Sequence, residues 1–445
     1  MWARLDTERL ADALTDQSTL GAACYPALAW RAFGTDGNPD PMEAFALDGD
    51  DDSSLFDDGA EDDDDFDESS QEPMRFPEWV RQTRPTVRRW LLRSATMQAS
   101  VTALDGLALP IWADSAHLAQ ALQLSTDDLG WLARPHWLLA PRGQESKHLS
   151  ASHYRHRLIS KARGGLRLLE VPKQQLAATQ RHILEQLLNR IPVHEAAHGF
   201  VAGRSVHTHA ATHAKQATVC AFDLRDFFHS ISAAQIRALW RSLGYPSGIA
   251  NELTALTTVV TPRAVRERLL EDGSISRNQA RRLALPHLAQ GAPTSPALAN
   301  LCAFRLDMRL AALAEKFSAR YSRYADDMVF SGPAHLRTNF ASLHGWVRGI
   351  ASDEGFVLHP EKTRRMPSHK QQRVTGLIVN ETPNLPREAY DQLRAELYQL
   401  SRQSSVPRAL KAKLQGRVAW ACNAVSPSRR EKLRAMLAQI PFASA

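Results

Sequence analysis

Residues 323–332 read Arg-Tyr-Ala-Asp-Asp-Met-Val-Phe-Ser-Gly. Apolar and β-prone residues flank two adjacent acids, and this pattern predicts a β-hairpin with Asp326 and Asp327 at its tip. Two neighbouring carboxylates repel each other, so such a tip is unfavourable unless a cation lies beside it. Carboxylate oxygens are hard ligands of the kind that Mg²⁺ prefers. The stretch therefore predicts a hairpin that holds a divalent metal ion.

A second acidic site lies upstream, at residues 219–228, which read Val-Cys-Ala-Phe-Asp-Leu-Arg-Asp-Phe-Phe. The short apolar run predicts a strand that ends at Asp223. If this strand lies beside the hairpin, Asp223 lies opposite Asp326, and the acids can hold two metal ions about 3.5–4 Å apart, as in-line phosphoryl transfer requires. Acids are common in turns, so neither acidic site alone defines a function.

A third motif lies between the two acidic sites, at residues 290–301, which read Gln-Gly-Ala-Pro-Thr-Ser-Pro-Ala-Leu-Ala-Asn-Leu. Its Gly/Pro turn allows the backbone to approach a ligand closely before an apolar helix begins. In this order and spacing, the three motifs resemble the palm of reverse transcriptases. The resemblance implies an α+β right-hand polymerase with fingers, palm and thumb, in which helices back an antiparallel palm sheet, and it implies RNA-directed DNA polymerase activity.

The resemblance also implies catalytic roles for matching residues. Asp223, Asp326 and Asp327 would bind two Mg²⁺ ions, which Mn²⁺ can replace, and the backbone carbonyl of Leu224 would be a further metal ligand. Lys362 lies in the next palm motif and would donate a proton to the leaving pyrophosphate. A phosphate contact or a solvated lysine are the alternative roles for Lys362.

Five residues would contact the incoming deoxynucleoside triphosphate. The ring of Phe228 would clash with a ribose 2′-OH and so select dNTPs, although an aromatic core residue is the simpler alternative. Gln290 and Gly291 would line the nucleotide and template pocket. Lys161 and Arg167 lie on a predicted fingers hairpin and would reach the triphosphate; ordinary surface charge is the alternative reading for both.

Two further elements resemble retron reverse transcriptases, and the long N-terminal region, with predicted helices at 78–140, resembles the long-form retron enzymes of myxobacterial type. Residues 209–213 match the Asn-Ala-x-x-His element of these enzymes, except that His replaces the Asn, and residues 374–376 match their Val-Thr-Gly triplet. Retron membership implies that a folded non-coding RNA is both template and primer. An internal RNA 2′-OH would start synthesis of a branched, RNA-linked single-stranded DNA (msDNA), and the system would act in antiphage defence with an effector protein.

Charge is distributed unevenly along the 445 residues. Residues 43–72 hold 15 Asp and Glu with no Lys or Arg, whereas residues 73–445 hold 51 Lys and Arg against 27 Asp and Glu. The large excess of positive charge over residues 73–445 indicates a surface that binds nucleic acid more than one that only keeps the protein soluble. The sequence shows no transmembrane run, no signal peptide and no CxxC pair, so we expect a cytoplasmic protein with reduced thiols and no membrane partner.

Composition and pattern divide the chain into six regions. The acidic run is predicted to be disordered, either as a solvated linker or as a mimic of nucleic acid in the basic groove. The regions are a short N-terminal helical segment (1–33), the acidic disordered linker (34–77), a helical N-terminal accessory region (78–149), the fingers (150–215), the palm (216–380) and an RNA-binding thumb (381–445).

Basic residues near the C-terminus are predicted to bind phosphates of an RNA stem, with a solvated basic face as the alternative. On the same predicted helix, Leu410, Leu414 and Val418 form an apolar face that we assign to the core. The full set of expected RNA contacts is His209, His213, Arg408, Lys411, Lys413 and Arg417.

Other functions compete with this interpretation. Residues 194–198 read His-Glu-Ala-Ala-His, a zinc-hydrolase motif that would need a helix, but Pro192 and Gly199 flank it closely. A group II intron-like, CRISPR-associated or abortive-infection reverse transcriptase would share the palm motifs. The fold could also serve as an RNA-binding scaffold that restrains a toxic partner, although the intact aspartates favour catalysis.

Overall fold

The computed structural model describes residues 107–134, 153–161 and 164–443. The predictions for residues 1–77, and for residues 78–106 and 135–149 of the accessory region, lie outside the described residues. In the accessory region, Ser125 caps helix α5 (Thr126–Leu132) by accepting a hydrogen bond from the backbone of Asp128. No helix in the described part of the chain is long and apolar enough to cross a membrane.

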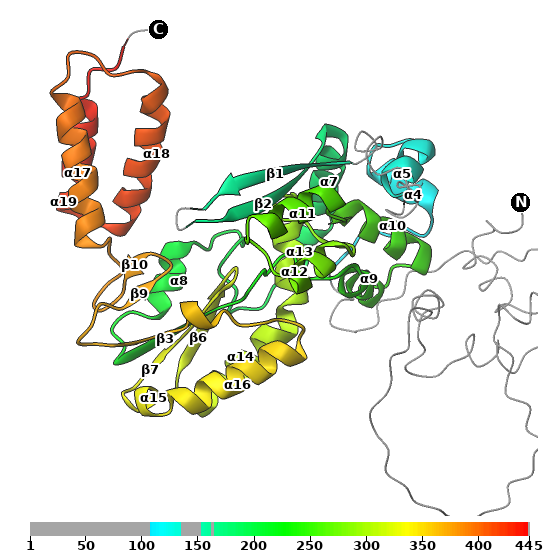
Figure 1. Cartoon of the computed structure of the whole chain (residues 1–445), viewed down its shortest axis with the longest axis horizontal. Helices are drawn as coiled ribbons and strands as arrows, with labels where there is room; N and C mark the ends of the chain where they lie inside the picture. Colours follow the sequence, from blue (N-terminus) through cyan, green and yellow to red (C-terminus); the bar gives the residue numbers. More distant parts are fainter. Residues whose placement is uncertain (1–106, 135–152, 162–163, 444–445) are drawn as a thin grey trace, which may run out of the picture. The chain divides into compact units, whose positions relative to one another are not determined.

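A four-stranded antiparallel sheet carries the predicted catalytic motifs (Figure 1). Its strand order is β6-β7-β3-β8, with β6 (Arg320–Tyr324), β7 (Asp327–Gly332), β3 (Thr218–Asp223) and β8 (Arg364–Pro367). Strand β3 is paired on both sides, so its backbone hydrogen bonds are satisfied within the sheet.

The side chains of β3 alternate between two hydrophobic clusters, because successive residues of a strand point to opposite faces. Cys220 and Phe222 join the larger core, where Phe222 stacks on Phe340 at 6.0 Å between ring centroids. Phe340 begins helix α16 (Phe340–Asp353), which packs beside α14 (Phe304–Lys316). Val219 joins a second cluster on the other face. The antiparallel sheet backed by helices, predicted from the sequence, is confirmed.

Strands β1 (Tyr154–Ser160) and β2 (Leu166–Pro172) form the hairpin predicted from the sequence. Gly164 and Gly165 have positive φ values of 88° and 77°, a conformation that suits glycine in a tight turn. Helix α7 (Gln174–Gln186) follows and packs against β2.

The segment between β3 and the catalytic hairpin is mainly helical and supplies much of the larger core, including the fully buried Trp240. Its elements are α9 (Ala233–Ser242), α10 (Ser247–Thr257), β4 (Thr258–Val259), α11 (Arg263–Glu271), α12 (Arg277–Leu283), β5 (His287–Leu288) and α13 (Ser295–Cys302).

The last three helices lie at the C-terminal end of the chain, and the third of them packs against the other two (Figure 1). They are α17 (Arg387–Ser401), α18 (Ala409–Ala424) and α19 (Pro427–Ala438), and the paired strands β9 (Arg373–Val374) and β10 (Leu377–Ile378) precede them. Leu414 and Val418 are buried as predicted, but Leu410 is 37% exposed. The assignment of Leu410 to the core was wrong, because this residue lies in the first turn of α18, where few neighbours cover it.

Candidate active site

The predicted carboxylates meet at the ends of adjacent strands. In the register of the sheet, Asp223 at the end of β3 faces Asp327 at the start of β7. Asp326 lies at the hairpin tip, and its carbonyl accepts a 3.0 Å hydrogen bond from the backbone N–H of Leu224. The predicted neighbourhood is therefore correct, but the residue directly opposite Asp223 is Asp327 rather than Asp326.

The hairpin between β6 and β7 turns sharply at Ala325. This residue has a φ of 56°, in the left-handed region that non-glycine residues adopt at a cost. Gly199 lies directly against the turn, where a Cβ atom would come within 2.6 Å of the backbone nitrogen of Ala325. The side chain of Asn300, from the third motif, donates a 2.8 Å hydrogen bond to the carbonyl of Gly199.

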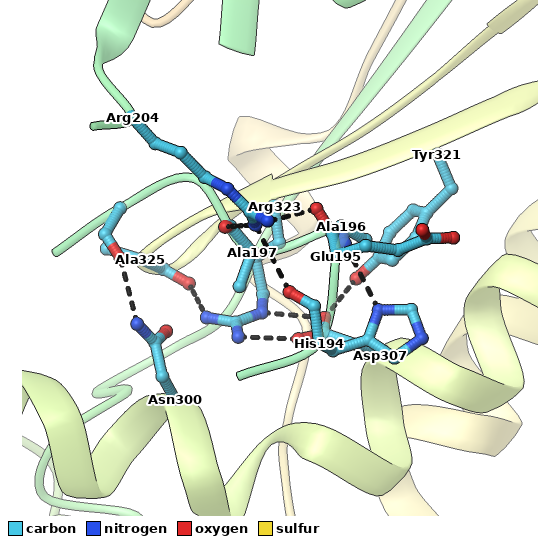
Figure 2. A network of polar contacts seen from close by, with 11 residues as sticks. His194, Glu195, Ala196, Ala197, Arg204, Asn300, Asp307, Tyr321, Arg323 and Ala325 are labelled. Carbon is cyan, nitrogen blue, oxygen red and sulfur yellow. Dashed lines mark hydrogen bonds and ion pairs between the residues drawn. The ribbon is translucent and has the colours of Figure 1, made fainter. Parts of the chain in front are cut away.

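A buried polar network holds the base of the hairpin (Figure 2). Arg323 donates from Nε and Nη2 to the two carboxylate oxygens of Asp307, at 2.8 and 2.6 Å. Its Nη1 donates to the carbonyl of Ala325 at 2.9 Å, and the hydroxyl of Tyr321 donates to Asp307 at 2.8 Å. Asp307 could not be predicted from the sequence, because nothing near it in the sequence distinguishes it from a surface acid of a helix.

Burial and mutual repulsion raise the pKa values of two of the predicted catalytic residues, Asp326 and Asp327. Burial raises the pKa of Asp327 to about 6, with further contributions from Asp326 and Asp223. Burial and Asp223 also raise the pKa of Asp326. A cation at this position would relieve the repulsion, and the donor atoms are oxygens, as Mg²⁺ prefers. The residues present therefore fit a divalent metal ion.

The three aspartates line a cavity of about 460 Å³ together with Lys362, Arg364 and Arg373. Lys362 donates to both carboxylate oxygens of Asp223, at 2.9 and 3.0 Å. Among the described residues, only Glu170, His229 and His287 bring three potential metal-ligand atoms within 4.8 Å of one another, and the aspartates do not. In this arrangement the Lys362 ammonium supplies the positive charge beside Asp223.

None of the predicted nucleotide-binding residues lines this cavity. Arg167 on β2 is close enough to lower the pKa of Asp326 through its charge. The carbonyl of Gln290 accepts a 2.9 Å hydrogen bond from the backbone of Glu170, which ties the third motif to β2. Gly291 has a φ of 123°, which only glycine adopts readily. Lys161 is exposed at the end of the β1–β2 hairpin.

Phe228 follows β3 and is partly buried. Its ring lies 6.0 Å from that of Phe200 and 5.5 Å from that of Phe227, between centroids. Phe200 in turn lies 6.4 Å from Tyr324 of the catalytic hairpin. These contacts place Phe228 among aromatic rings beside the active site while leaving part of its surface accessible.

Two of the expected RNA contacts are corrected by the structure, since His209 and His213 are fully buried. His213 bonds to the hydroxyls of Ser331 and Ser322, each at 2.7 Å. His209 bonds to the hydroxyl of Thr375 at 3.2 Å. Burial lowers the pKa of both rings, that of His209 to about 3, so both are neutral.

The side chains of His209 and His213 therefore fasten helix α8 (Val206–Thr212) to the sheet and do not form a surface for RNA. The hydrogen bond between His209 and Thr375 also connects two distant segments of the chain. It joins residues 209–213 to residues 374–376, the two elements that resemble retron enzymes.

The basic side chains predicted to bind RNA on α18 are exposed: Arg408, Lys411, Lys413 and Arg417. Arg417 is engaged within the protein, because its Nη1 lies 2.6 and 2.7 Å from the two carboxylate oxygens of Glu396. The ammonium of Lys411 lies 5.6 Å from the ring of Phe442. Arg417 would therefore have to leave Glu396 before it could bind a phosphate, and Lys411 already contacts an aromatic ring.

The zinc-hydrolase alternative is wrong, because residues 194–198 form a turn and a bridge instead of a helix. The ring of His194 packs against Phe304, whereas His198 bonds to the hydroxyl of Thr208 at 3.0 Å. Figure 2 shows that Arg204 donates to carbonyls of this segment instead. The segment supports the catalytic hairpin, since the N–H of His198 donates to the carbonyl of Arg323 at 2.7 Å.

Comparison with known proteins identifies the class. The profile of the family described as Reverse transcriptase (RNA-dependent DNA polymerase) matches residues 159–379. The protein is therefore an RNA-directed DNA polymerase.

Curated relatives narrow the assignment. The chain is 36% identical to the Retron Mx65 reverse transcriptase of Myxococcus xanthus, over 80% of this chain and 83% of that protein. It is 39% identical to the Retron Mx162 reverse transcriptase of the same organism, over 64% of this chain and 58% of that protein. The chain belongs to the retron reverse transcriptases and resembles those of myxobacteria.

Solved structures show weaker similarity. They include a foamy viral protease-reverse transcriptase in complex with double-stranded DNA, at 12% identity and a TM-score of 0.35, covering 65% of this chain and 43% of that one. They also include telomerase from Candida albicans, at 11% identity and a TM-score of 0.34, covering 66% of this chain and 57% of that one.

Proposed function

We propose that this enzyme copies a dedicated non-coding RNA into msDNA, starting from an internal RNA 2′-OH, as part of an antiphage defence system. The observation that carries the proposal is the register of β3 and β7, which brings Asp223 and Asp327 face to face beside Asp326. Contact between the two retron-like elements, through His209 and Thr375, supports the retron-specific part.

The three aspartates would hold two Mg²⁺ ions, with the Leu224 carbonyl as a further ligand. When bound, these ions activate the attacking hydroxyl and stabilise the leaving pyrophosphate. The raised pKa of Asp327 means that its carboxylate, once ionised, is poorly compensated by the protein alone. This uncompensated charge favours cation binding.

Lys362 would change partners during the reaction. Its ammonium pairs with Asp223 in the free enzyme, yet its side chain is 48% exposed and so can move. Its ammonium would leave Asp223 and donate a proton to the pyrophosphate oxygen. Arg167 would neutralise phosphate charge from the β1–β2 side.

Phe228 would exclude a ribose 2′-OH, and Gln290 and Gly291 would line the nucleotide pocket. We assign residues 150–215 to the fingers, 216–380 to the palm and 381–445 to an RNA-binding thumb. In the thumb, Lys413 and Arg408 would contact phosphates of the RNA stem.

The test is to express the protein together with its flanking genomic sequence and to extract nucleic acid from the purified complex. We expect single-stranded DNA that survives RNase and shifts after treatment with debranching enzyme. The double variant Asp326→Ala/Asp327→Ala should lack this DNA. The matched control Glu381→Ala/Glu388→Ala, at two exposed acids far along the chain, should retain it.

Bound RNA without DNA in the unaltered protein would contradict polymerisation and would favour a scaffold that only binds RNA. DNA that does not shift on debranching would contradict priming from a 2′-OH while leaving the polymerase activity intact.

A further inference from the structure

A fully buried carboxylate lies among three histidines, next to the proposed nucleotide pocket. Glu170 on β2 has no exposed surface. Its Oε2 lies 3.1 Å from Nε2 of His287 and 3.5 Å from Nε2 of His229. Its Oε1 accepts a 2.7 Å hydrogen bond from the Thr261 hydroxyl and lies 3.6 Å from Nε2 of His156. Segments far apart in the sequence therefore converge on one carboxylate.

A carboxylate this deeply buried requires positive charge beside it. The polar groups around its two oxygens are three imidazole nitrogens and the Thr261 hydroxyl. Neutral imidazole rings do not supply the charge. Either the rings carry an additional proton or a metal ion lies between them and the carboxylate.

The hydrogen bonds of His287 rule out a neutral ring that donates to Glu170, and they fit a metal ligand. Its Nδ1 lies 2.8 Å from the carbonyl of Leu285 and must donate to it, because a carbonyl only accepts. In the neutral ring, Nε2 then presents a lone pair to Oε2 of Glu170, and two acceptors repel each other. A histidine that donates from one nitrogen to a backbone carbonyl and offers the other as a ligand is the usual arrangement at metal sites.

Two buried histidine nitrogens without hydrogen-bond partners also support a metal ion. The Nε2 atoms of His229 and His156 are buried and make no hydrogen bond. A buried nitrogen without a partner costs free energy, about 1–3 kcal/mol. A metal ion would engage the lone pair of His229 and could engage that of His156.

The spacing suits zinc. The ligand atoms of Glu170, His229 and His287 lie within 4.8 Å of one another. A tetrahedral zinc ion with bonds of about 2.0–2.2 Å sets its ligand atoms roughly 3.3–3.6 Å apart. The distances of 3.1 and 3.5 Å from Glu170 to the two histidines are close to this value. Histidine nitrogens with a carboxylate oxygen are also a ligand set that zinc accepts.

We propose that Glu170, His229 and His287 bind a structural zinc ion, with His156 or a water molecule as the fourth ligand. The ion would join β2, the turn after β3, and β5. Its neighbours are residues of the nucleotide pocket: His229 follows Phe228, and the backbone of Glu170 holds the Gln290 carbonyl at 2.9 Å. Zinc would thus fix the position of the pocket without touching the substrate.

The test is zinc binding by the purified full-length protein, after a chelator wash, in competition with a chromophoric chelator. We expect one zinc ion per chain. The variant His229→Gln, at the more accessible ligand, should lower zinc affinity by more than the roughly 10- to 100-fold that loss of an outer-shell partner costs. The matched control His182→Gln, at a partly buried histidine outside the cluster, should bind zinc normally.

The catalytic aspartates are the other oxygen ligands that could take zinc. The variant Asp326→Asn/Asp327→Asn should therefore still bind one zinc ion. Cobalt substitution should give the strong visible absorption of four-coordinate Co²⁺, and circular dichroism should report whether each variant is folded. His287→Gln provides a second ligand variant if His229→Gln does not fold.

Absence of stoichiometric zinc in the unaltered protein would overturn the proposal, and so would loss of zinc from Asp326→Asn/Asp327→Asn. The cluster would then be a carboxylate neutralised by protonated histidine. Since zinc is measured without RNA or nucleotide, a chain that binds zinc but makes no msDNA would contradict only the proposed function.

Discussion

Arg323 and Asp307 form a fully buried, two-bonded ion pair beneath the catalytic hairpin. Burial alone would lower the pKa of Arg323, but Asp307 raises it above its ordinary value, so the guanidinium stays charged. Arg323 also holds the carbonyl of Ala325, the residue before Asp326. The pair therefore links the position of a catalytic carboxylate to the packing of helix α14.

Breaking this pair should destabilise the fold strongly. Arg323→Met leaves the Asp307 carboxylate buried without its partner, which typically costs about 3–5 kcal/mol. We expect a loss of that size in the free energy of unfolding, measured by urea denaturation. The control Arg348→Met, at an exposed position of α16, should change it by less than about 0.5 kcal/mol. Equal effects of the two substitutions would contradict the structural role of Arg323.

The stability of the metal-free enzyme should depend on pH through Asp327. Its folded-state pKa of about 6 exceeds the ordinary value of 3.8, so the folded protein binds this proton more tightly than the unfolded chain does. The resulting stabilisation is complete below about pH 3.8 and is lost as the pH rises through about 6. Above that pH, the ionised carboxylate destabilises the fold.

At pH 7.5 in chelator, Asp327→Asn should therefore melt at a higher temperature than the unaltered protein, and its free energy of unfolding should be larger by on the order of 1–3 kcal/mol. The difference should shrink toward pH 5, and added Mg²⁺ should stabilise the unaltered protein more than the variant. Calorimetry across this pH range measures both effects. Glu381→Gln, at an exposed acid, is the control; a variant no more stable than the parent at pH 7.5 would refute the prediction.

Phe228 should govern sugar selection. Phe228→Val removes ring volume beside Phe200 and should raise the relative use of ribonucleotides roughly 10- to 100-fold, as expected when a steric contact is lost. Single-nucleotide extension with paired dNTP and rNTP substrates measures the ratio of kcat/KM values. Trp346→Val, at a residue 60% exposed on α16, should leave the ratio unchanged. An unchanged ratio in Phe228→Val would assign the ring to the core alone.

The basic residues of α18 should contribute unequally to RNA binding. Lys413 is exposed, whereas Arg417 is already paired with Glu396. Lys413→Gln should reduce the salt dependence of RNA binding by about one phosphate contact, and Arg417→Gln should reduce it less. Fluorescence titration of an RNA hairpin over a range of salt concentrations checks this order. The reverse order would mean that RNA displaces Glu396 from Arg417.

Local patterns predicted the catalytic strands well. The apolar run before Asp223, the acids at 326 and 327 and the paired glycines at 164 and 165 each determine structure over a few residues, and the turn or strand they predict is present. The family resemblance supplied the order of these motifs along the chain, and hence the antiparallel sheet. The one-residue error in the partner of Asp223 arose because register depends on pairing across strands, which no local pattern specifies.

Local sequence patterns could not predict the contacts between distant segments. His209 and His213 look accessible in a basic sequence, yet Ser322, Ser331 and Thr375 enclose them. Glu170 and His287 are 117 residues apart, and neither belongs to a metal-binding motif. Burial of a polar side chain is decided by the complete fold, so these residues could be interpreted only from the structure.

The absence of a side chain at position 199 has a consequence for how this enzyme can change. The backbone of Ala325 occupies the space that any Cβ atom at position 199 would need. Position 199 and the hairpin tip therefore constrain each other: a homologue's side chain at position 199 would fit only with a hairpin tip whose backbone lies elsewhere. A chimera that brings a side chain to position 199 should therefore fold only if its hairpin tip comes from the same homologue.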